Sequence, residues 1–124
     1  MVVTVLCFLL NMQDTVAFTP ATKAALVAAV DSWCSDQEAA VATYGAIRNW
    51  DTSLVTDMSF LFSARRPFAC YATFNDDIGG WDTSSVTTMK DMFSEATAFD
   101  QDVSAWDVSG VTTMENMFKD ASSF

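Results

Sequence analysis

Histidine is absent from the 124-residue sequence, and glycine and proline are scarce, with four and two residues. Without histidine, catalytic triads and metal sites that depend on an imidazole are excluded. Four glycines leave no glycine-rich loop of the kind that surrounds phosphate groups. None of the cysteines has a neighbouring base that could activate it. We therefore expect no catalytic and no cofactor-binding residues, and predict that the chain is not an enzyme.

Basic residues are also few: six lysines and arginines stand against sixteen aspartates and glutamates, giving a net charge of −10 at pH 7. A nucleic-acid-binding surface needs a basic stripe, and an anionic membrane attracts basic segments, so both partners are disfavoured. The apolar run in MVVTVLCFLL is too short for a helix that crosses a bilayer, which needs about 20 residues. We expect a mature chain with no transmembrane span.

Residues 1–17 have features of a signal peptide. Their short apolar run suits its hydrophobic region, and Thr15-Val16-Ala17 offers small residues for cleavage. Because no lysine or arginine precedes the run, a buried strand and a misplaced start codon stay open as alternatives. The sequence AFTP from Ala17 is also similar to the cleavage site of algal plastid presequences, but the basic residues of a transit peptide are missing. The predicted location is secreted or cell-surface, with plastid targeting as the alternative.

One motif occurs three times in the remaining sequence, and the second and third copies are 25 residues apart. A period of this length is typical of stacked repeat proteins. The copies are IRNWDTSLVTDMSFLFS from Ile47, IGGWDTSSVTTMKDMFSEATAF from Ile78 and VSAWDVSGVTTMENMFKDASSF from Val103.

The first copy contains six extra residues, which we place in a loop at 64–73 because insertions in repeat arrays map to loops. We divide the repeat region, 47–124, into units 47–77, 78–102 and 103–124. The third unit stops before its loop closes, so we expect the chain to be a fragment or a truncated gene product.

Spacing within the motif predicts a short strand followed by a short helix. Its opening, Ile-x-x-Trp-x-Thr/Val, alternates inward and outward residues as a strand does. The residues that follow are apolar at i, i+3, i+6 and i+7, which is one face of a helix, and we expect their methionines and phenylalanines to form the core. The expected helix N-caps are Thr56, Thr87 and Thr112. The predicted fold is thus α/β, a leucine-rich-repeat-like solenoid with one short parallel strand and one short helix per 25-residue repeat.

Residues 18–46 are predicted to form a helical cap. Thr19 is the expected N-cap of a first helix, with Pro20 at its first position. Ser35 and Glu38 form a capping box that would open a second helix, which ends before Gly45. We expect both helices to cover the N-terminal edge of the solenoid, and a partner-binding helix is the alternative.

The repeat resembles a known family. Its motif, W-D-[TV]-S-x-V-T-x-M-x-x-[ML]-F followed by A-x-x-F, is similar to that of the BspA-like leucine-rich-repeat surface proteins, in the variant abundant in mycoplasma surface lipoproteins and in algal secreted proteins. The resemblance covers residues 45–124. It implies a solenoid of parallel strands, exposure at or outside the cell surface, a role in adhesion or protein binding, and no catalytic residues. Arrays of that family usually contain many repeats.

The three cysteines are Cys7, Cys34 and Cys70. Cleavage after Ala17 would remove the first and leave one pair, with Cys34 in the cap and Cys70 in the insertion of the adjacent repeat. A disulfide between them would join cap and repeats, stabilise the fold by about 2–4 kcal/mol and require an oxidising compartment. Two buried free thiols are the alternative.

An aspartate follows the tryptophan in every copy and is expected to point outward. In stacked strands about 4.8 Å apart these side chains would form a column. Two carboxylates about 5 Å apart repel by about 3 kcal/mol at an effective dielectric constant near 20. We name the acidic column after its members, Asp51, Asp82 and Asp107.

Two arrangements would relieve this repulsion. The serines two residues after each aspartate could donate hydrogen bonds, as in ordinary turns. Alternatively Ca²⁺, which prefers such oxygen ligands, could bridge carboxylates. The calcium candidates are Asp51, Asp82 and Asp107 of the column, together with Asp77 and Asp102, which align between copies.

The insertion is where the first copy departs from the shared motif, so we expect ligand specificity there, with Arg65 and Arg66 as candidate contact residues. The sequence as a whole predicts a secreted or cell-surface, non-catalytic repeat protein that binds a protein or glycan or mediates adhesion. The alternative is a structural solenoid segment of a larger protein, stiffened by calcium in one version, with its function encoded beyond residue 124.

Overall fold

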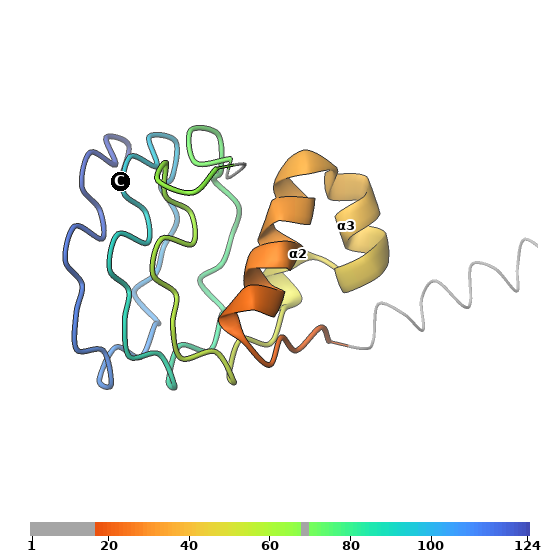
Figure 1. Cartoon of the computed structure of the whole chain (residues 1–124), viewed down its shortest axis with the longest axis horizontal. Helices are drawn as coiled ribbons and strands as arrows, with labels where there is room; N and C mark the ends of the chain where they lie inside the picture. The colour runs from red at the N-terminus through yellow and green to blue at the C-terminus, as the bar shows by residue number, and fades with distance from the viewer. Residues whose placement is uncertain (1–16, 68–69) are drawn as a thin grey trace, which may run out of the picture.

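The computed structural model describes residues 17–67 and 70–124. Two α-helices lie at one end of the molecule, and the repeat region forms a series of coils that lie side by side next to them (Figure 1). We call these coils the repeat stack, defined as residues 47–124. The predicted signal peptide, apart from Ala17, and Cys7 lie outside the described residues.

Helix α2 comprises Lys23–Ser35 and packs Leu26, Ala29, Val30 and Trp33 into the core. Its N-cap is Thr22, whose hydroxyl accepts the Ala25 N–H at 3.2 Å. The prediction of Thr19 as the cap was therefore wrong, because a second threonine nearer the apolar residues satisfies the free N–H of the first turn. Pro20 precedes the helix and is buried.

Helix α3 comprises Gln37–Tyr44. Its cap is Asp36, whose carboxylate accepts the Ala39 N–H at 3.1 Å, so the predicted capping box that starts at Ser35 is displaced by one residue. The helix ends at Tyr44, before Gly45 as predicted, and the φ of 76° at Gly45 is one that glycine adopts without steric cost. A short 3-10 helix, η1 (Ile47–Asn49), then leads into the repeat stack.

The predicted α/β leucine-rich-repeat solenoid is wrong. Residues 17–67 and 70–124 contain no strand, only isolated parallel bridges that join Asp57 to Thr88 and Thr88 to Thr113. The expected strand at Ile78 is instead a turn, in which the Trp81 N–H donates to the Ile78 carbonyl three residues earlier. Side chains replace a backbone ladder here, because the Thr83 hydroxyl donates to the Asp107 carbonyl of the next repeat at 3.0 Å.

The expected helices are absent as well, and their place is taken by consecutive turns. Met92 donates to the Met89 carbonyl, and Ser94 to the Asp91 carbonyl. Asp91 has a φ of 54°, and the equivalent residues Phe60 and Asn116 are also left-handed. An α-helix does not continue through a left-handed residue. A chain of turns repeats every three residues, so it buries nearly the same positions as a helix, which explains the wrong prediction.

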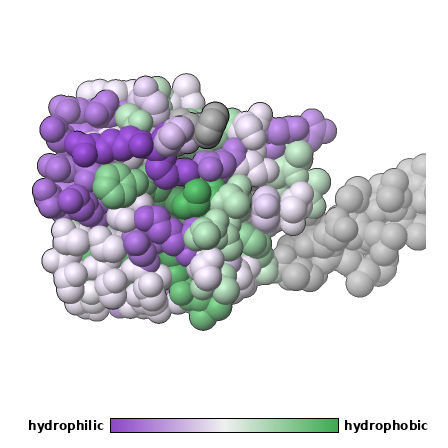
Figure 2. All heavy atoms as spheres, viewed as in Figure 1, coloured by the Kyte–Doolittle hydropathy of each residue, from purple (hydrophilic) through white to green (hydrophobic). Residues whose placement is uncertain are grey.

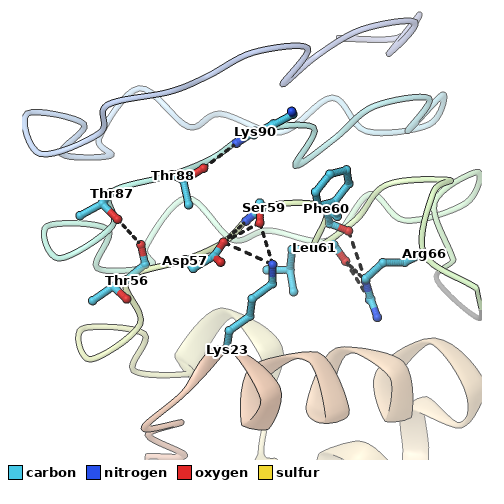
Figure 3. A network of polar contacts seen from close by, with 10 residues as sticks. All are labelled: Lys23, Thr56, Asp57, Ser59, Phe60, Leu61, Arg66, Thr87, Thr88 and Lys90. Carbon is cyan, nitrogen blue, oxygen red and sulfur yellow. Dashed lines mark hydrogen bonds and ion pairs between the residues drawn. The ribbon is translucent and has the colours of Figure 1, made fainter.

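The threonines expected to cap these helices bond between repeats. The Thr87 hydroxyl donates to the Thr56 carbonyl at 3.1 Å, and the Thr112 hydroxyl to the Thr87 carbonyl at 3.0 Å (Figure 3 shows the first pair). Each hydroxyl therefore joins a coil to the one before it instead of closing a helical turn.

A ladder of backbone hydrogen bonds joins each coil to the next. In each of the first two repeats, four alternate N–H groups donate to carbonyl oxygens of the following repeat. The donors and acceptors of the first pair are Met58 to Thr88, Phe60 to Lys90, Phe62 to Met92 and Ala64 to Ser94. Those of the second pair are Met89 to Thr113, Asp91 to Glu115, Phe93 to Met117 and Glu95 to Lys119. Between each two neighbouring repeats, one further bond runs from the later repeat to the earlier one: the Thr87 N–H donates to the Thr56 carbonyl, and the Thr112 N–H donates to the Thr87 carbonyl.

The core of the stack consists of columns of equivalent aromatic residues. Phe62, Phe93 and Phe118 stack with ring centroids 5.4 Å apart, and a second phenylalanine column lies beside them. The indole N–H of Trp81 donates to the Ile47 carbonyl at 2.8 Å, which anchors one coil on the previous one. The predicted methionine core is confirmed in the first two repeats, but Met114 in the third is 43% exposed.

At Gly79 the backbones of neighbouring coils lie too close together for a side chain. A Cβ atom at this position would overlap the backbone carbonyl oxygen of Asp102, whereas at Gly80 the nearest atom, the Arg48 carbonyl oxygen, would be 3.9 Å away. We expect Gly79→Ala to lower the free energy of unfolding by about 1–3 kcal/mol because the coils must separate. Gly80→Ala, the matched control, should change it by less than about 0.5 kcal/mol. Urea unfolding measures both, and equal stability of the two variants would contradict this packing.

Candidate functional site

The acidic column forms from turns that the serines of the motif complete. In each repeat the aspartate Oδ1 accepts the N–H of the serine two residues later, at 3.0 Å for Asp51 and 2.9 Å for both Asp82 and Asp107. The Ser109 hydroxyl also donates to Asp107, at 2.6 Å, and the Ser84 hydroxyl donates to Asp82. Of the two arrangements that would relieve the repulsion between the carboxylates, the structure contains hydrogen bonds from the serines.

These hydrogen bonds keep the column charged. Bonds from the serine hydroxyl and then from its backbone N–H hold the pKa of all three column carboxyls below the ordinary value of 3.8. Repulsion from the next carboxylate raises the pKa of Asp51 and of Asp82, but this effect is smaller. The column therefore presents a fixed row of negative charge, and two of its members, Asp82 and Asp107, are exposed.

The remaining calcium candidates also complete turns. Asp77 Oδ1 accepts the Gly79 N–H at 3.0 Å, and Asp102 Oδ1 accepts the Ser104 N–H at 2.9 Å. Hydrogen bonds from Ser104 lower the pKa of Asp102. Within the described ranges no three or more acidic or cysteine side chains gather closely enough to hold a metal ion. Calcium binding stays a prediction, and the turns account for these aspartates without it.

Lys23 joins α2 to the first repeat. Its ammonium group donates to the Ser59 hydroxyl at 2.7 Å and to Asp57 Oδ1 at 3.3 Å, and Asp57 also accepts the Ser59 N–H and hydroxyl (Figure 3). Burial raises the pKa of Asp57, but the bonds from Ser59 and the charge of Lys23 outweigh it and lower this pKa overall. No sequence motif includes Lys23, and its being the only lysine or arginine before Arg48 is the one signal that could have pointed to it.

The two arginines predicted to contact a ligand both make contacts within the chain. Arg66 donates from Nε and Nη2 to the Leu61 carbonyl and from Nε to the Phe60 carbonyl, and its Nη1 lies 2.8 Å from Asp31 of α2. Its side chain is only 14% exposed. Arg65 is about half exposed, and its Nε lies 3.8 Å from the fully buried Asp91. Arg66 therefore serves to attach α2 to the first repeat.

Cys34 and Cys70 are joined by a disulfide in the structure. The bond connects the end of α2 to the insertion of the first repeat. A hydrogen bond from the Trp33 indole N–H to Asp76 Oδ2, 2.9 Å long, lies next to it in sequence and links the same two parts. Cap and first repeat are thus fixed to each other by covalent, ionic and hydrogen bonds.

A known family covers most of this architecture. The family described as Mycoplasma protein of unknown function, DUF285, matches residues 30–124. The chain belongs to the DUF285 family. The match begins within α2 and includes α3 and all three repeats. Comparisons with curated proteins and with solved structures gave no match.

The DUF285 match agrees with the mycoplasma part of the resemblance and does not confirm its BspA-like leucine-rich-repeat part. No helix in the part of the chain that the structure describes combines the length and the apolar character needed to cross a membrane. The acidic column and the attachment of α2 lie inside the range that the family covers, apart from Lys23.

The protonation of the column provides a test of its geometry. A carboxyl whose pKa is lower in the folded state adds stability above the unfolded pKa, about 3.9, and this contribution is lost as the pH falls through the folded pKa. We expect Ser84→Ala to raise the pKa of Asp82 towards its ordinary value, because the variant keeps the N–H donor and loses the hydroxyl. Titration of side-chain carboxyl ¹³C shifts by NMR measures this pKa.

Ser85→Ala is the matched control, since this neighbouring exposed serine makes no hydrogen bond to Asp82. The control should leave the pKa of Asp82 unchanged. If Ser84→Ala also leaves it unchanged, the serine hydroxyl does not stabilise the carboxylate.

Proposed function

We propose that this DUF285 chain is a secreted or cell-surface, non-catalytic repeat protein that binds protein or glycan ligands and acts in adhesion or recognition. The observation that supports it most is the disulfide between Cys34 and Cys70. Disulfides persist in oxidising environments outside the cytosol. Since this bond fixes the cap on the first repeat, the folded protein suits an extracellular compartment.

The acidic column is the proposed binding surface. It repeats one charged group at one position of successive coils, and the serine bonds hold each carboxylate in a defined place. A ligand with positively charged groups at a matching spacing would contact several carboxylates at once. Hydrophilic side chains also gather over the C-terminal end of the repeat stack on the face shown in Figure 2. The net charge of −10 makes nucleic acid an unsuitable ligand.

Binding without catalysis fits the electrostatics of these groups. A general acid or base needs a pKa near the working pH, which for a carboxyl means a raised value. Among the described residues, five carboxyls have a pKa that departs from the ordinary value, and in all five the pKa is lowered: Asp51, Asp57, Asp82, Asp102 and Asp107. Such groups stay ionised at neutral pH and serve as fixed charges.

A second function, as a structural segment of a larger protein, is favoured by one observation. Met114 and Phe124 in the third repeat are 43% and 52% exposed, whereas their equivalents Met89 and Phe99 are fully buried. The third coil thus has one side that another coil would cover.

Neutralising the column tests the proposed binding surface. We expect the wild-type chain to bind one or more ligands on arrays of extracellular proteins and glycans. The triple variant Asp51→Asn, Asp82→Asn, Asp107→Asn should bind at least about tenfold more weakly, because asparagine keeps the turn and loses the charge. Surface plasmon resonance on the array ligand measures this change.

The control is a triple variant that loses three negative charges outside the acidic column, at exposed positions: Glu38→Gln, Glu95→Gln and Asp120→Asn. It should bind like the wild type. Equal loss in both triple variants would show that only net charge matters, and no array ligand for the wild type would contradict the proposed function.

The redox state of the cysteines tests the compartment. We expect the protein isolated without reductant and then denatured to show no reaction of Cys34 or Cys70 with maleimide, and both to react after reduction. Mass spectrometry of tryptic peptides measures the labelling. In the control variant Cys34→Ser, Cys70 should react without reduction. Two reactive thiols in the unreduced wild-type protein would exclude an oxidising compartment.

A further inference from the structure

The repeat stack has two chemically different edges. Four of the five backbone hydrogen bonds at each junction run from an N–H of the earlier coil to a carbonyl of the later coil, and one, from Thr87 or Thr112, runs the other way. The side of a coil that faces the N-terminal end therefore presents mainly carbonyl acceptors, and the side that faces the C-terminal end presents mainly N–H donors.

Residues of the cap and of the insertion lie along the acceptor edge of the first coil. Its carbonyls, by equivalence with the second coil, are those of Asp57, Ser59, Leu61 and Ser63. The Leu61 carbonyl accepts from the Arg66 guanidinium, and the Ser63 carbonyl from the Arg66 N–H. The Lys23 ammonium lies beside the Asp57 and Ser59 side chains (Figure 3). Two cations thus stand where a preceding coil would supply N–H groups.

The opposite edge belongs to the third coil and is open. The ladder donors of the second coil are the N–H groups of Met89, Asp91, Phe93 and Glu95. Their equivalents in the third coil are the N–H groups of Met114, Asn116, Phe118 and Asp120. None of these four has an acceptor among residues 17–67 and 70–124. The side chains of Val108, Met114 and Phe124, 42%, 43% and 52% exposed, accompany this row. We call these four N–H groups and three side chains the donor edge.

A hollow of about 570 Å³ adjoins the donor edge and is lined by residues 100–104 and Phe124. One repeat earlier, the corresponding contact is made between coils, because Asn75 accepts the Asp100 N–H and the Gln101 amide. The register of the stack therefore places the return segment of a further coil in this hollow.

We propose that the donor edge is a docking surface for a separate polypeptide segment that carries this same repeat motif. The segment lies parallel to residues 111–120, supplies carbonyl oxygens at alternate residues and extends the two phenylalanine columns. The argument is continuity: this edge repeats the donors and side chains by which the first coil holds the second and the second holds the third. The inference stands apart from the proposed binding by the acidic column.

Two other occupants are disfavoured by the same polarity. A second copy related by a two-fold axis would set N–H donors against N–H donors, which leaves both rows unpaired. A second copy stacked head to tail would need a free acceptor edge, but Lys23, Arg66 and α2 cover that edge in every copy. The segment must therefore come from a coil without such a cap.

A peptide with the sequence of residues 100–124 tests the proposal when it is added in excess to the full chain. It begins where a return segment begins, and it supplies the carbonyls of one complete coil. We expect amide hydrogen exchange of Met114, Asn116, Phe118 and Asp120, followed by NMR, to slow by about tenfold or more. A scrambled peptide should leave these rates unchanged, and equal protection by both peptides would overturn the proposal.

Two variants make the test specific. Met114→Lys should abolish the protection by placing a charge on the donor edge, whereas Leu54→Lys, at a residue 56% exposed in the first repeat, should not. Equal protection in both variants would overturn the proposal.

A chain extended after Phe124 by a second copy of residues 100–124 controls for a peptide that fails to form a coil. Protection by the added peptide supports docking of a separate segment. Protection only in the extended chain, or in neither case, overturns it, as does a symmetric dimer that Met114→Lys disrupts.

Discussion

The repeat stack depends on the ladder of backbone hydrogen bonds between coils, in which four of the five bonds at each junction run in one direction. Each coil contains a left-handed residue, at Phe60, Asp91 or Asn116, and such a conformation costs about 1–2 kcal/mol outside glycine. No single coil recovers this cost internally, because its alternate N–H groups find acceptors only on the next coil. Stability therefore comes from junctions, as in other repeat arrays, and the aromatic columns add burial at every junction. An isolated coil is not a folding unit.

The direction of the ladder leaves carbonyl groups on the N-terminal side of the first coil, and the cap covers that side. Buried carbonyl groups need donors, and Arg66 of the insertion donates to the Leu61 carbonyl. Lys23 of α2 binds the side chains of Asp57 and Ser59 beside these carbonyl groups. The disulfide between Cys34 and Cys70 then fixes the helix and the insertion to each other. The insertion in the first repeat, where ligand contacts are predicted, also lies against the cap and contributes Arg66 to that attachment.

Sequence periodicity predicted the buried tryptophans, and the capping patterns predicted the helical nature of the cap. The disulfide was one of two alternatives that the cysteine count left open. Periodicity failed on the conformation of the coils, because turns that repeat every three residues and helical turns bury nearly the same positions in Val86–Phe93. Aspartate at Asp91 is a residue type that tolerates a left-handed φ, but the equivalent Phe60 carries no such signal. The roles of Lys23 and Arg66 depend on contacts between segments more than 30 residues apart or on backbone carbonyls, which no local pattern encodes.

Because each interior coil has one donor side and one acceptor side, any coil can follow any other. Duplication of a 25-residue unit within the gene would lengthen the protein by about 4.8 Å, one inter-strand spacing, and leave both ends chemically unchanged. The same would hold for loss of a unit. The length of such a protein can therefore change by whole repeats under selection, while the disulfide-linked cap stays the same.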